Sequence, residues 1–215
     1  MALGHLLHGS HDPAAPGALG NARGYELFCK VVLFGRRRRM YGQLVALSGA
    51  RPGDRVLDVG CGPGYLTRMM ARAVAPDGSA LGVDAAPTMI GYAIQHTRES
   101  HCTFVQGLGE ALDLADSSFD VVVTSLAVHH IPADKRARAV EEMYRVLRPG
   151  GRVLIADFRP PSGRTAWHLV GRAAGPEMAH NPIHILGPLA ESAGFTELSG
   201  GDVRPFLAYV RGVKP

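Results

Sequence analysis

Short apolar runs and longer stretches with helical periodicity alternate along most of this chain. The short runs combine apolar with β-branched residues, as buried strands do, and cover residues 56–59, 80–84, 102–106, 119–125 and 152–157. Because stretches with a period near 3.6 residues separate these runs, the pattern predicts βαβ units with right-handed crossovers. The expected fold class is therefore α/β, built on a parallel sheet.

Helical stripes fill the spaces between the runs and continue beyond them. The expected helices cover residues 66–75, a segment opening at Pro87, residues 134–147 and residues 183–193. Asp134 is expected to cap the third of these helices, and Arg148-Pro-Gly-Gly151 to end it. After the last helix, residues 195–200 and 205–213 are expected to form two closing strands joined by Gly-Asp.

Three segments depart from this alternation. Residues 1–20 are rich in Gly, Pro, Ala and His without a period, so we expect a flexible tail. Residues 21–50 carry a helical period interrupted by glycines, which predicts an amino-terminal helical cap. Residues 159–182 are irregular and contain four prolines. Because no internal repeat is present, residues 21–215 are expected to form a single domain.

The run at residues 56–59 leads directly into a glycine-rich turn, Gly60-Cys-Gly-Pro-Gly64, and then into an expected helix. Glycine permits positive φ and lets a ligand approach the backbone closely. A strand, a glycine turn and a helix N-terminus form the usual nucleotide cradle of an open α/β sheet. The loop lacks the GxGxxG spacing that dehydrogenases prefer, and Tyr65-Leu66 is not the Lys-Ser/Thr pair of a phosphate loop.

Two further features converge on the same end of the expected sheet. Asp84 ends the second strand, where a carboxylate can accept two hydrogen bonds from a ribose diol. Residues 107–110 follow the third strand, and residues 125–130 follow the fourth. Ligands of open α/β sheets bind at these carboxyl ends, so we expect one pocket lined by all three segments.

Composition and charge limit the partners and the cellular location that we expect for this protein. The net charge is +4, and Arg36 to Arg39 is the one tight charge run, typical of an exposed helical turn. No apolar run approaches the ~18 residues of a transmembrane helix, and no basic segment precedes one as in a secretory signal. The three cysteines, Cys29, Cys61 and Cys102, are scattered, which predicts neither disulfides nor a metal site and favours a cytoplasmic location.

The order of these motifs resembles class I S-adenosylmethionine-dependent methyltransferases. It is most similar to the small-molecule, type 11 subgroup that includes the ubiquinone and menaquinone C-methyltransferases. The matching motifs are Val56–Tyr65, Val83-Asp84, Gly107–Leu112, Ser118–Val122, Ala127–Pro132, Arg145–Gly151 and Leu189–Phe195. The resemblance implies a Rossmann-like, doubly wound, seven-stranded sheet, mostly parallel with an antiparallel final strand. It also implies S-adenosylmethionine as cofactor and S-adenosylhomocysteine as product.

The resemblance also implies which residues hold the cofactor. Gly60, Cys61 and Gly62 would lie under the methionine portion, with Asp58 anchoring the loop and the amino group. Asp84 would bind the ribose hydroxyls. The remaining expected contacts are Ala85 and Met89 near the adenine, Leu108, Gly109 and Glu110 at its edge, and Ser125 and Leu126 over the sulfonium. The family often has Asp where this chain has Leu108, so a backbone group or Glu110 would have to contact the adenine amino group instead.

Two histidines at the end of the fourth strand are the candidate catalytic residues. Histidine titrates near neutral pH, and an acceptor hydroxyl or acidic carbon needs a base. We expect His130, more than His129, to contact the acceptor or take its proton. The alternative is that the His-His-Ile-Pro turn only positions the loop. Cys61 is expected to be a small buried side chain rather than a nucleophile.

The expected reaction is methyl transfer to a small-molecule O, C or N nucleophile by in-line displacement. The acceptor is expected to be partly aromatic or apolar and to lie between the helical cap and the irregular segment. The substrate-side residues would be Tyr25, Phe28, Tyr41, Trp167, His168 and His180. Thr124-Ser-Leu-Ala differs from the (Asn/Asp)-Pro-Pro-aromatic motif of adenine-N6 and glutamine methyltransferases, and scattered cysteines disfavour arsenite. Two rivals remain: a macromolecular, RNA-directed methyltransferase using Arg36–Arg39, and a cofactor-binding member that transfers no methyl group.

Overall fold

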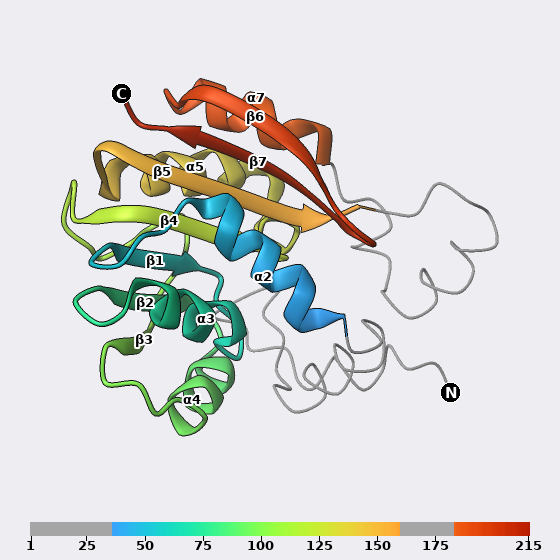
Figure 1. The fold of residues 1–215 in the computed structure, drawn as a ribbon. Coiled ribbons are helices and arrows are strands. Elements are labelled where there is room, and N and C mark those ends of the chain that lie inside the picture. The colour runs from blue at the N-terminus through green and yellow to red at the C-terminus, as the bar shows by residue number, and fades with distance from the viewer. Residues whose placement is uncertain (1–35, 160–182) are drawn as a thin grey trace.

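The computed structural model describes residues 36–159 and 183–215, and these form a sheet with helices on both faces (Figure 1). The sheet has seven strands in the order β3-β2-β1-β4-β5-β7-β6. β1 to β5 are mutually parallel, and β7 runs antiparallel to both β5 and β6. The strands are β1 Arg55–Val59, β2 Ser79–Asp84, β3 Cys102–Gln106, β4 Phe119–Ser125, β5 Leu147–Phe158, β6 Thr196–Val203 and β7 Leu207–Val213. The expected seven-stranded, Rossmann-like α/β fold is confirmed.

Two apolar cores lie on opposite faces of this sheet. One core packs α2, α3 and α4 against the sheet, and the other packs α5 and α7. In β4, Val121 and Val123 face the first core while Val122 faces the second, as expected for a strand buried on both sides. The helices are α2 Arg37–Ser48, α3 Tyr65–Val74, α4 Pro87–Gln95, α5 Arg136–Val146 and α7 Leu186–Ser192, with 3-10 turns Val128–His130, Ala133–Lys135 and Ile183–Ile185.

The strand order reverses at the centre of the sheet. From β1 the chain moves outward to β2 and β3, then returns to place β4 on the other side of β1. The loops that leave the carboxyl ends of β1 and β4 therefore diverge, and a crevice opens between them. The glycine turn after β1 lies at this topological switch point, where ligands of open α/β sheets bind.

Two expected element boundaries are wrong because long-range backbone pairing moves them. Gly150 N–H donates to Lys214 O at 2.8 Å, and Lys214 N–H donates to Gly151 O at 2.9 Å. These bonds extend β5 back to Leu147, so Arg148–Gly151 belongs to the strand and is not a separate turn. In the closing hairpin, Asp202 pairs with Ala208 inside the ladder, and the turn falls at residues 204–206 rather than at Gly-Asp.

The start of α5 also differs from the expectation. A 3-10 turn over Ala133–Lys135 precedes the helix, and α5 begins at Arg136. Lys135 occupies the N-cap position without a side-chain capping hydrogen bond, so Asp134 does not cap this helix. The reason is geometric: the tighter turn after Pro132 places Asp134 inside the 3-10 segment, two residues before the first α-helical one.

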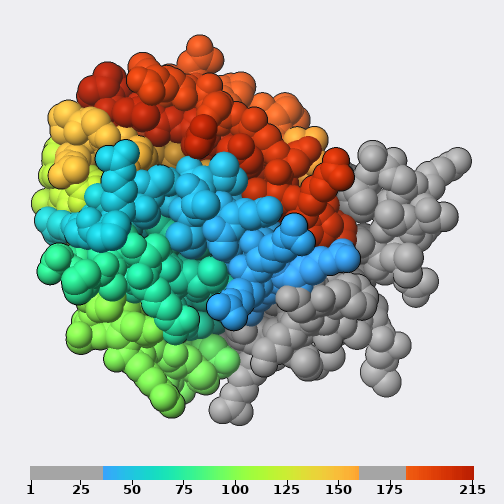
Figure 2. Space-filling model, viewed as in Figure 1, coloured from blue at the N-terminus to red at the C-terminus, as the bar shows by residue number. Residues whose placement is uncertain are grey.

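The arginine run differs from the expected exposed turn at one position. Arg36, Arg38 and Arg39 are exposed, whereas Arg37 is buried with 7% of its surface accessible. In the space-filling view of Figure 2, α2 forms part of the surface between α3 and the β6–β7 hairpin. Among the described residues, no helix has the length and apolarity to cross a membrane.

Candidate active site

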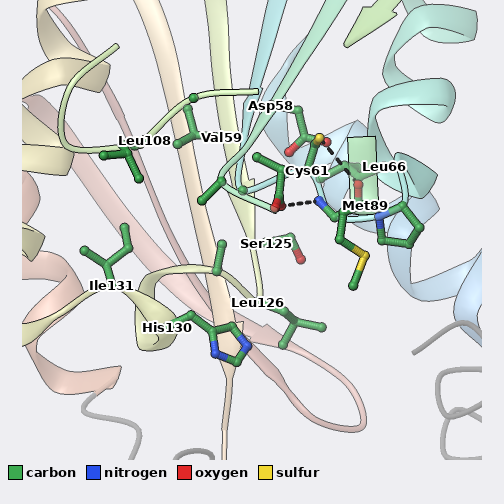
Figure 3. A pocket seen from close by; sticks show the side chains of 18 of the residues that line it. Asp58, Val59, Cys61, Leu66, Met89, Leu108, Ser125, Leu126, His130 and Ile131 are labelled. Atoms are coloured by element: carbon green, nitrogen blue, oxygen red, sulfur yellow. Dashed lines mark hydrogen bonds between the residues drawn. The ribbon is translucent and has the colours of Figure 1, made fainter. Parts of the chain in front are cut away.

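One pocket opens at the carboxyl ends of the central strands, at the topological switch point. Figure 3 shows Asp58 and Leu66 on one side of it and Leu126 and His130 across from them. All twelve residues that the sequence suggested for the cofactor line this pocket: Asp58, Gly60, Cys61, Gly62, Asp84, Ala85, Met89, Leu108, Gly109, Glu110, Ser125 and Leu126. Tyr41 and His130 line it too.

The glycine turn forms the floor of the pocket. At two of its positions a side chain would either overlap the protein or enter the cavity. Gly60 has φ +71°, and a Cβ there would overlap the Cβ of Ala127. Gly62 has φ +52°, and a Cβ there would meet no protein atom within 4 Å, because the position faces the cavity. Gly60 N–H donates to Val83 O at 2.8 Å, which ties the turn to the end of β2. The floor is thus rigid and open to a ligand.

Asp84 joins the glycine turn to the start of α4. Its Oδ2 accepts a hydrogen bond from Gly62 N–H at 2.8 Å, and its Oδ1 accepts one from Ala86 N–H at 2.9 Å. Burial raises the pKa of this carboxyl, while these two backbone hydrogen bonds and the charge of His130 oppose the rise. Each oxygen can accept a second hydrogen bond, so the oriented carboxylate can still receive a ribose diol.

Asp58 lies deeper, at the end of β1 beneath the glycine turn. Only 1% of its surface is accessible, and Thr67 Oγ1–H donates to its Oδ2 at 2.6 Å. Burial raises the pKa of Asp58 to about 7, with the hydrogen bond from Thr67 opposing the rise and the charge of Asp84 adding to it. A carboxylate in this position gains from any cationic group that a ligand brings into the pocket.

Cys61 and Cys102 are buried free cysteines. Burial is the main cause that raises the pKa of the Cys61 thiol well above its ordinary value, and the charges of Asp58 and Asp84 add to it. Burial also raises the pKa of Cys102 to about 12. Both side chains are therefore thiols near neutral pH, which supports the expectation that Cys61 packs rather than reacts.

The loops after β3 and β4 close the remaining sides of the pocket. Leu108 is 40% exposed at the rim, and the neighbouring Glu110 carboxylate pairs with Lys135 Nζ at 3.2 Å. Leu126 adopts φ +58°, an uncommon conformation for a non-glycine residue that clusters at functional sites. Within the described part of the chain, the buried Ser125 Oγ has no hydrogen-bond partner, although the residue lines the pocket. An acceptor or donor from a ligand would satisfy this hydroxyl.

The two candidate histidines have different environments. His130 lines the pocket, whereas the His129 side chain is 1% accessible and lies outside it. His129 Nδ1 lies 2.6 Å from Asp157 Oδ1, and His129 N–H donates to Asp157 Oδ2 at 3.1 Å. The two imidazole rings are 4.0 Å apart between centroids. Asp157 thus fixes His129 next to His130, and of the two histidines only His130 is placed to meet a ligand in this pocket.

Ten further residues line the pocket that the sequence did not single out as contacts. They are Arg37, Val59, Pro63, Tyr65, Leu66, Gly107, Ala127, Ile131, Pro132 and Lys135. Most of them lie inside the matching motifs or next to them, whereas the available signal for Arg37 was its four-residue spacing from Tyr41, which puts both on one face of a helix. The other substrate-side candidates, Tyr25, Phe28, Trp167, His168 and His180, lie outside the described residues. The first half of the expected helical cap, residues 21–35, and the segment 160–182 lie outside them as well.

The fold and this pocket together define an α/β protein that binds a nucleotide-bearing cofactor at the switch point of its sheet. Over residues 36–159 and 183–215, no three side chains are grouped as a metal site would require. A family model described as a methyltransferase domain matches residues 56–151. The chain belongs to the class I S-adenosylmethionine-dependent methyltransferases, in the type 11 group.

Individual relatives agree with this family. A methyltransferase of Synechocystis is 35% identical over 149 residues, which are 67% of this chain and 68% of the relative. The demethylmenaquinone methyltransferase of Symbiobacterium thermophilum is 35% identical over 147 residues, 66% of this chain but only 58% of its own length. Among solved structures, Haemonchus contortus phosphoethanolamine N-methyltransferase 2 with S-adenosyl-L-methionine matches with a TM-score of 0.71 at 16% identity, covering 91% of this chain and 57% of that one.

The pocket fits the cofactor of this family. The open floor at Gly62 admits a ligand against the backbone, and the Ser125 hydroxyl offers a hydrogen-bonding group to it. Two carboxylates, the buried Asp58 and the partly buried Asp84, suit a ligand that carries both a cationic amino group and a ribose diol. The cofactor would be held by the glycine turn and these two residues.

Proposed function

We propose that this chain transfers a methyl group from S-adenosylmethionine to a small-molecule acceptor with an oxygen, carbon or nitrogen nucleophile. The observation that carries this proposal is a single pocket lined by the glycine turn, by Asp84 and by His130. The first two suit the cofactor, and the third is a titratable side chain on the opposite wall. On this proposal the cofactor and the acceptor would share one cavity.

The chain's main task in this reaction is alignment. The bound cofactor supplies a methyl group on a positively charged sulfur, which is already an activated leaving group. The rigid floor at Gly60 and the fixed carboxylate of Asp84 would hold that methyl group at one place in the pocket. Positioning an acceptor in line with it contributes roughly 7–11 kcal/mol to lowering the barrier. The apolar walls at Leu126 and Ile131 would keep water from the acceptor.

His130 is the residue best placed to take a proton from the acceptor. It lines the pocket near Asp84, whose pKa its charge lowers. His129 would act as a positioning residue, because its bond to Asp157 anchors the 3-10 turn that carries His130. This pair keeps the turn at Val128–His130 in one orientation.

Replacing His130 with alanine is expected to lower kcat by about 100-fold or more, since general-base catalysis contributes ~10²–10⁴-fold. Affinity for S-adenosylhomocysteine should change less than about threefold, because the imidazole faces the acceptor side. His129→Ala is expected to act differently: it removes the imidazole partner of the buried Asp157, which keeps only its backbone N–H donors, and lowers the melting temperature. Turnover, calorimetric binding and thermal melting of both variants separate these effects. Full activity in both variants would contradict a catalytic role for either histidine.

The lining of the pocket supports an apolar or aromatic acceptor. Leu126, Ile131 and Pro132 supply apolar contacts, and Tyr41 and Tyr65 supply aromatic ones, with ring centroids 5.2 Å apart. The name of the Symbiobacterium relative, a demethylmenaquinone methyltransferase, agrees with a ring-bearing acceptor of this kind. We therefore propose an aromatic small molecule with an ionisable hydroxyl or ring carbon.

Two rival functions make different predictions. An RNA methyltransferase would need a continuous basic surface, but Arg37 turns into the pocket and leaves three exposed arginines in the run. Its RNA binding would weaken steeply as salt increases. A member that binds the cofactor without transferring methyl would return no labelled product.

The decisive experiment incubates the protein with methyl-labelled S-adenosylmethionine and a metabolite extract, then identifies the labelled product by mass spectrometry. We expect a labelled small molecule, formed at the same time as S-adenosylhomocysteine. Label in RNA would favour the macromolecular alternative. Cofactor binding without any labelled product would contradict methyl transfer but not the cofactor site.

Cofactor affinity is expected to depend on pH through Asp58. The pKa of this carboxyl is raised to about 7, so below pH 7 it is mostly protonated in the ligand-free protein. A ligand with a cationic amino group favours the ionised carboxylate, and the proton must leave before that interaction forms. The affinity for S-adenosylhomocysteine should therefore rise as pH increases, up to about tenfold per pH unit below 7, and level off above it.

Calorimetric titrations between pH 5.5 and 8.5 measure this dependence directly. The Asp58→Asn variant should bind more weakly at pH 8 and should lose the component of the pH dependence centred near 7. Asp84, whose pKa is also raised, can leave a residual slope at lower pH in the same variant. An unchanged pH profile in Asp58→Asn would show that Asp58 does not face the amino group.

A further inference from the structure

Arg37 is a cation in the wall of the pocket, although its neighbours in the arginine run face solvent. It begins α2 and is 7% accessible, while Arg36, Arg38 and Arg39 are exposed. Burying a guanidinium is costly, and proteins compensate for it with partners that suit a planar cation. The position of Arg37 therefore indicates a specific role in the pocket that it lines.

Two tyrosines hold the guanidinium in place. Its Cζ lies 3.8 Å from the ring centroid of Tyr65 and 5.7 Å from that of Tyr41. The two rings meet edge to face at 70°. Stacking on Tyr65 stabilises the cation and orients its plane, which prepares the guanidinium for a planar anion such as a carboxylate.

The surroundings of Arg37 place it at the glycine-turn side of the pocket. Tyr65 directly follows Gly64 and is the first residue of α3, whose first turn contains no acidic residue. α2 packs against α3, and also against β4 and β5, which lie on the side of β1 away from β3. The loop after β3, with Leu108 and Glu110, lies toward the other edge. Arg37 is thus beside the part of the pocket that the glycine turn forms.

The charges on that side are arranged for a zwitterion. Asp58 supplies a buried carboxylate to the pocket, and Arg37, stacked on the residue that follows the glycine turn, supplies a buried cation to the same pocket. The amino-acid portion of the proposed cofactor carries one ammonium and one carboxylate on the same carbon. A site with only carboxylates would attract the ammonium and repel the carboxylate, so a matched cation is required.

We propose that Arg37 binds the α-carboxylate of the methionine portion of the cofactor while Asp58 binds its amino group. This assignment rests on the proposed function, because it takes S-adenosylmethionine as the ligand. It gives the arginine run a role in cofactor recognition through one member rather than a role in binding nucleic acid. Arg37 then discriminates between ligands that carry the carboxylate and ligands that lack it.

The test is a thermodynamic cycle that combines a change at Arg37 with a change in the ligand. One is S-adenosylhomocysteine, and the other is its decarboxylated analogue, which keeps the amino group, the thioether and the nucleoside. Arg37→Met removes the charge but keeps a long apolar side chain against Tyr65. Arg38→Met and Arg39→Met are matched controls in the same run, because both side chains are exposed. Calorimetry measures the dissociation constants of each ligand for each variant.

We expect Arg37→Met to weaken S-adenosylhomocysteine binding by about 10–100-fold, as for loss of hydrogen bonds to a charged group. Binding of the decarboxylated analogue should change less than about threefold, and both control variants should match the wild type. Arg37→Lys keeps the charge and most of the packing. It should lose affinity for S-adenosylhomocysteine but not for the decarboxylated analogue, and the loss should be smaller than in Arg37→Met. This second variant carries the test if the methionine variant folds poorly.

The outcomes separate this assignment from the proposed function. Equal losses for both ligands in Arg37→Met and Arg37→Lys would show a packing role and overturn the assignment. Unchanged binding of S-adenosylhomocysteine in both variants would also overturn the assignment. It would indicate that the guanidinium contacts the acceptor instead of the cofactor. If the wild type bound neither ligand, the proposed function itself would fail, and the assignment with it. If the wild type binds both ligands and the Arg37 variants lose affinity only for S-adenosylhomocysteine, the result supports both the assignment and the proposed function.

Discussion

Replacing Asp84 with alanine is expected to weaken binding of S-adenosylhomocysteine by at least about 100-fold. The carboxylate accepts hydrogen bonds from Gly62 N–H at 2.8 Å and from Ala86 N–H at 2.9 Å. Its removal leaves two backbone donors without their partner and takes away one of the hydrogen bonds that tie the glycine turn to the end of β2. It also removes the proposed acceptor for the ribose diol, and hydrogen bonds to a charged group contribute ~1.5–3 kcal/mol each.

Isothermal titration calorimetry and thermal melting together test this prediction. Asp84→Asn keeps the shape but places an amide where a carboxylate accepted two backbone N–H groups, so we expect an intermediate loss of affinity. Asp77→Ala, an exposed carboxylate in the turn before β2, is the matched control and should bind like the wild type. Wild-type affinity in Asp84→Ala would mean that neither the loop nor the ribose depends on this residue.

Much of the fold could be predicted because the determinants are local. Val121, Val122 and Val123 form a β-branched apolar run typical of a strand buried on both faces, and Pro87 opens a helix at the first position, as expected. The boundaries that were wrong depend on partners far along the chain. Lys214 extends β5 through Gly150 and Gly151, and no pattern near residue 150 announces a partner more than sixty residues away.

Some residues of the candidate site could also be predicted from the sequence, and others could not. Asp58 and Asp84 could be found because each lies in the last two residues of a central strand, and the carboxyl ends of parallel strands meet at one edge. Arg37 could not, because its burial depends on how α2 packs against Tyr65. The choice between His129 and His130 also needed the structure, since a three-residue 3-10 turn turns adjacent side chains to different sides.

The strand-end carboxylates also explain why the cofactor is easier to infer than the acceptor. Asp84 is oriented by backbone N–H groups of its own fold, so its role follows from its position on β2. The acceptor side is built from turns, including Leu126 at φ +58° and the 3-10 segment at Val128–His130. Turns tolerate changes in sequence more readily than central strands do, so this side can vary while the cofactor site is retained.

Alanine substitutions at three glycines with positive φ separate the effects of backbone strain, of steric overlap and of blocked ligand access. Gly53 has φ +90°, and a Cβ there would meet no atom within 4 Å. Gly62 is equally open at φ +52° but lines the pocket, and Gly60 at φ +71° has no room for a Cβ beside Ala127. Alanine at any of them carries a backbone cost of about 1–2 kcal/mol.

We therefore expect Gly53→Ala to melt earlier but to bind S-adenosylhomocysteine as the wild type does. Gly62→Ala should lose a similar amount of stability and about 100-fold or more in affinity, because its methyl group enters the space that the ligand needs. Gly60→Ala should be the least stable of the three, since overlap with Ala127 adds to the strain. Melting curves and calorimetry on the three variants decide the matter. If Gly62→Ala bound the ligand normally, the glycine turn could not be the floor on which the cofactor lies.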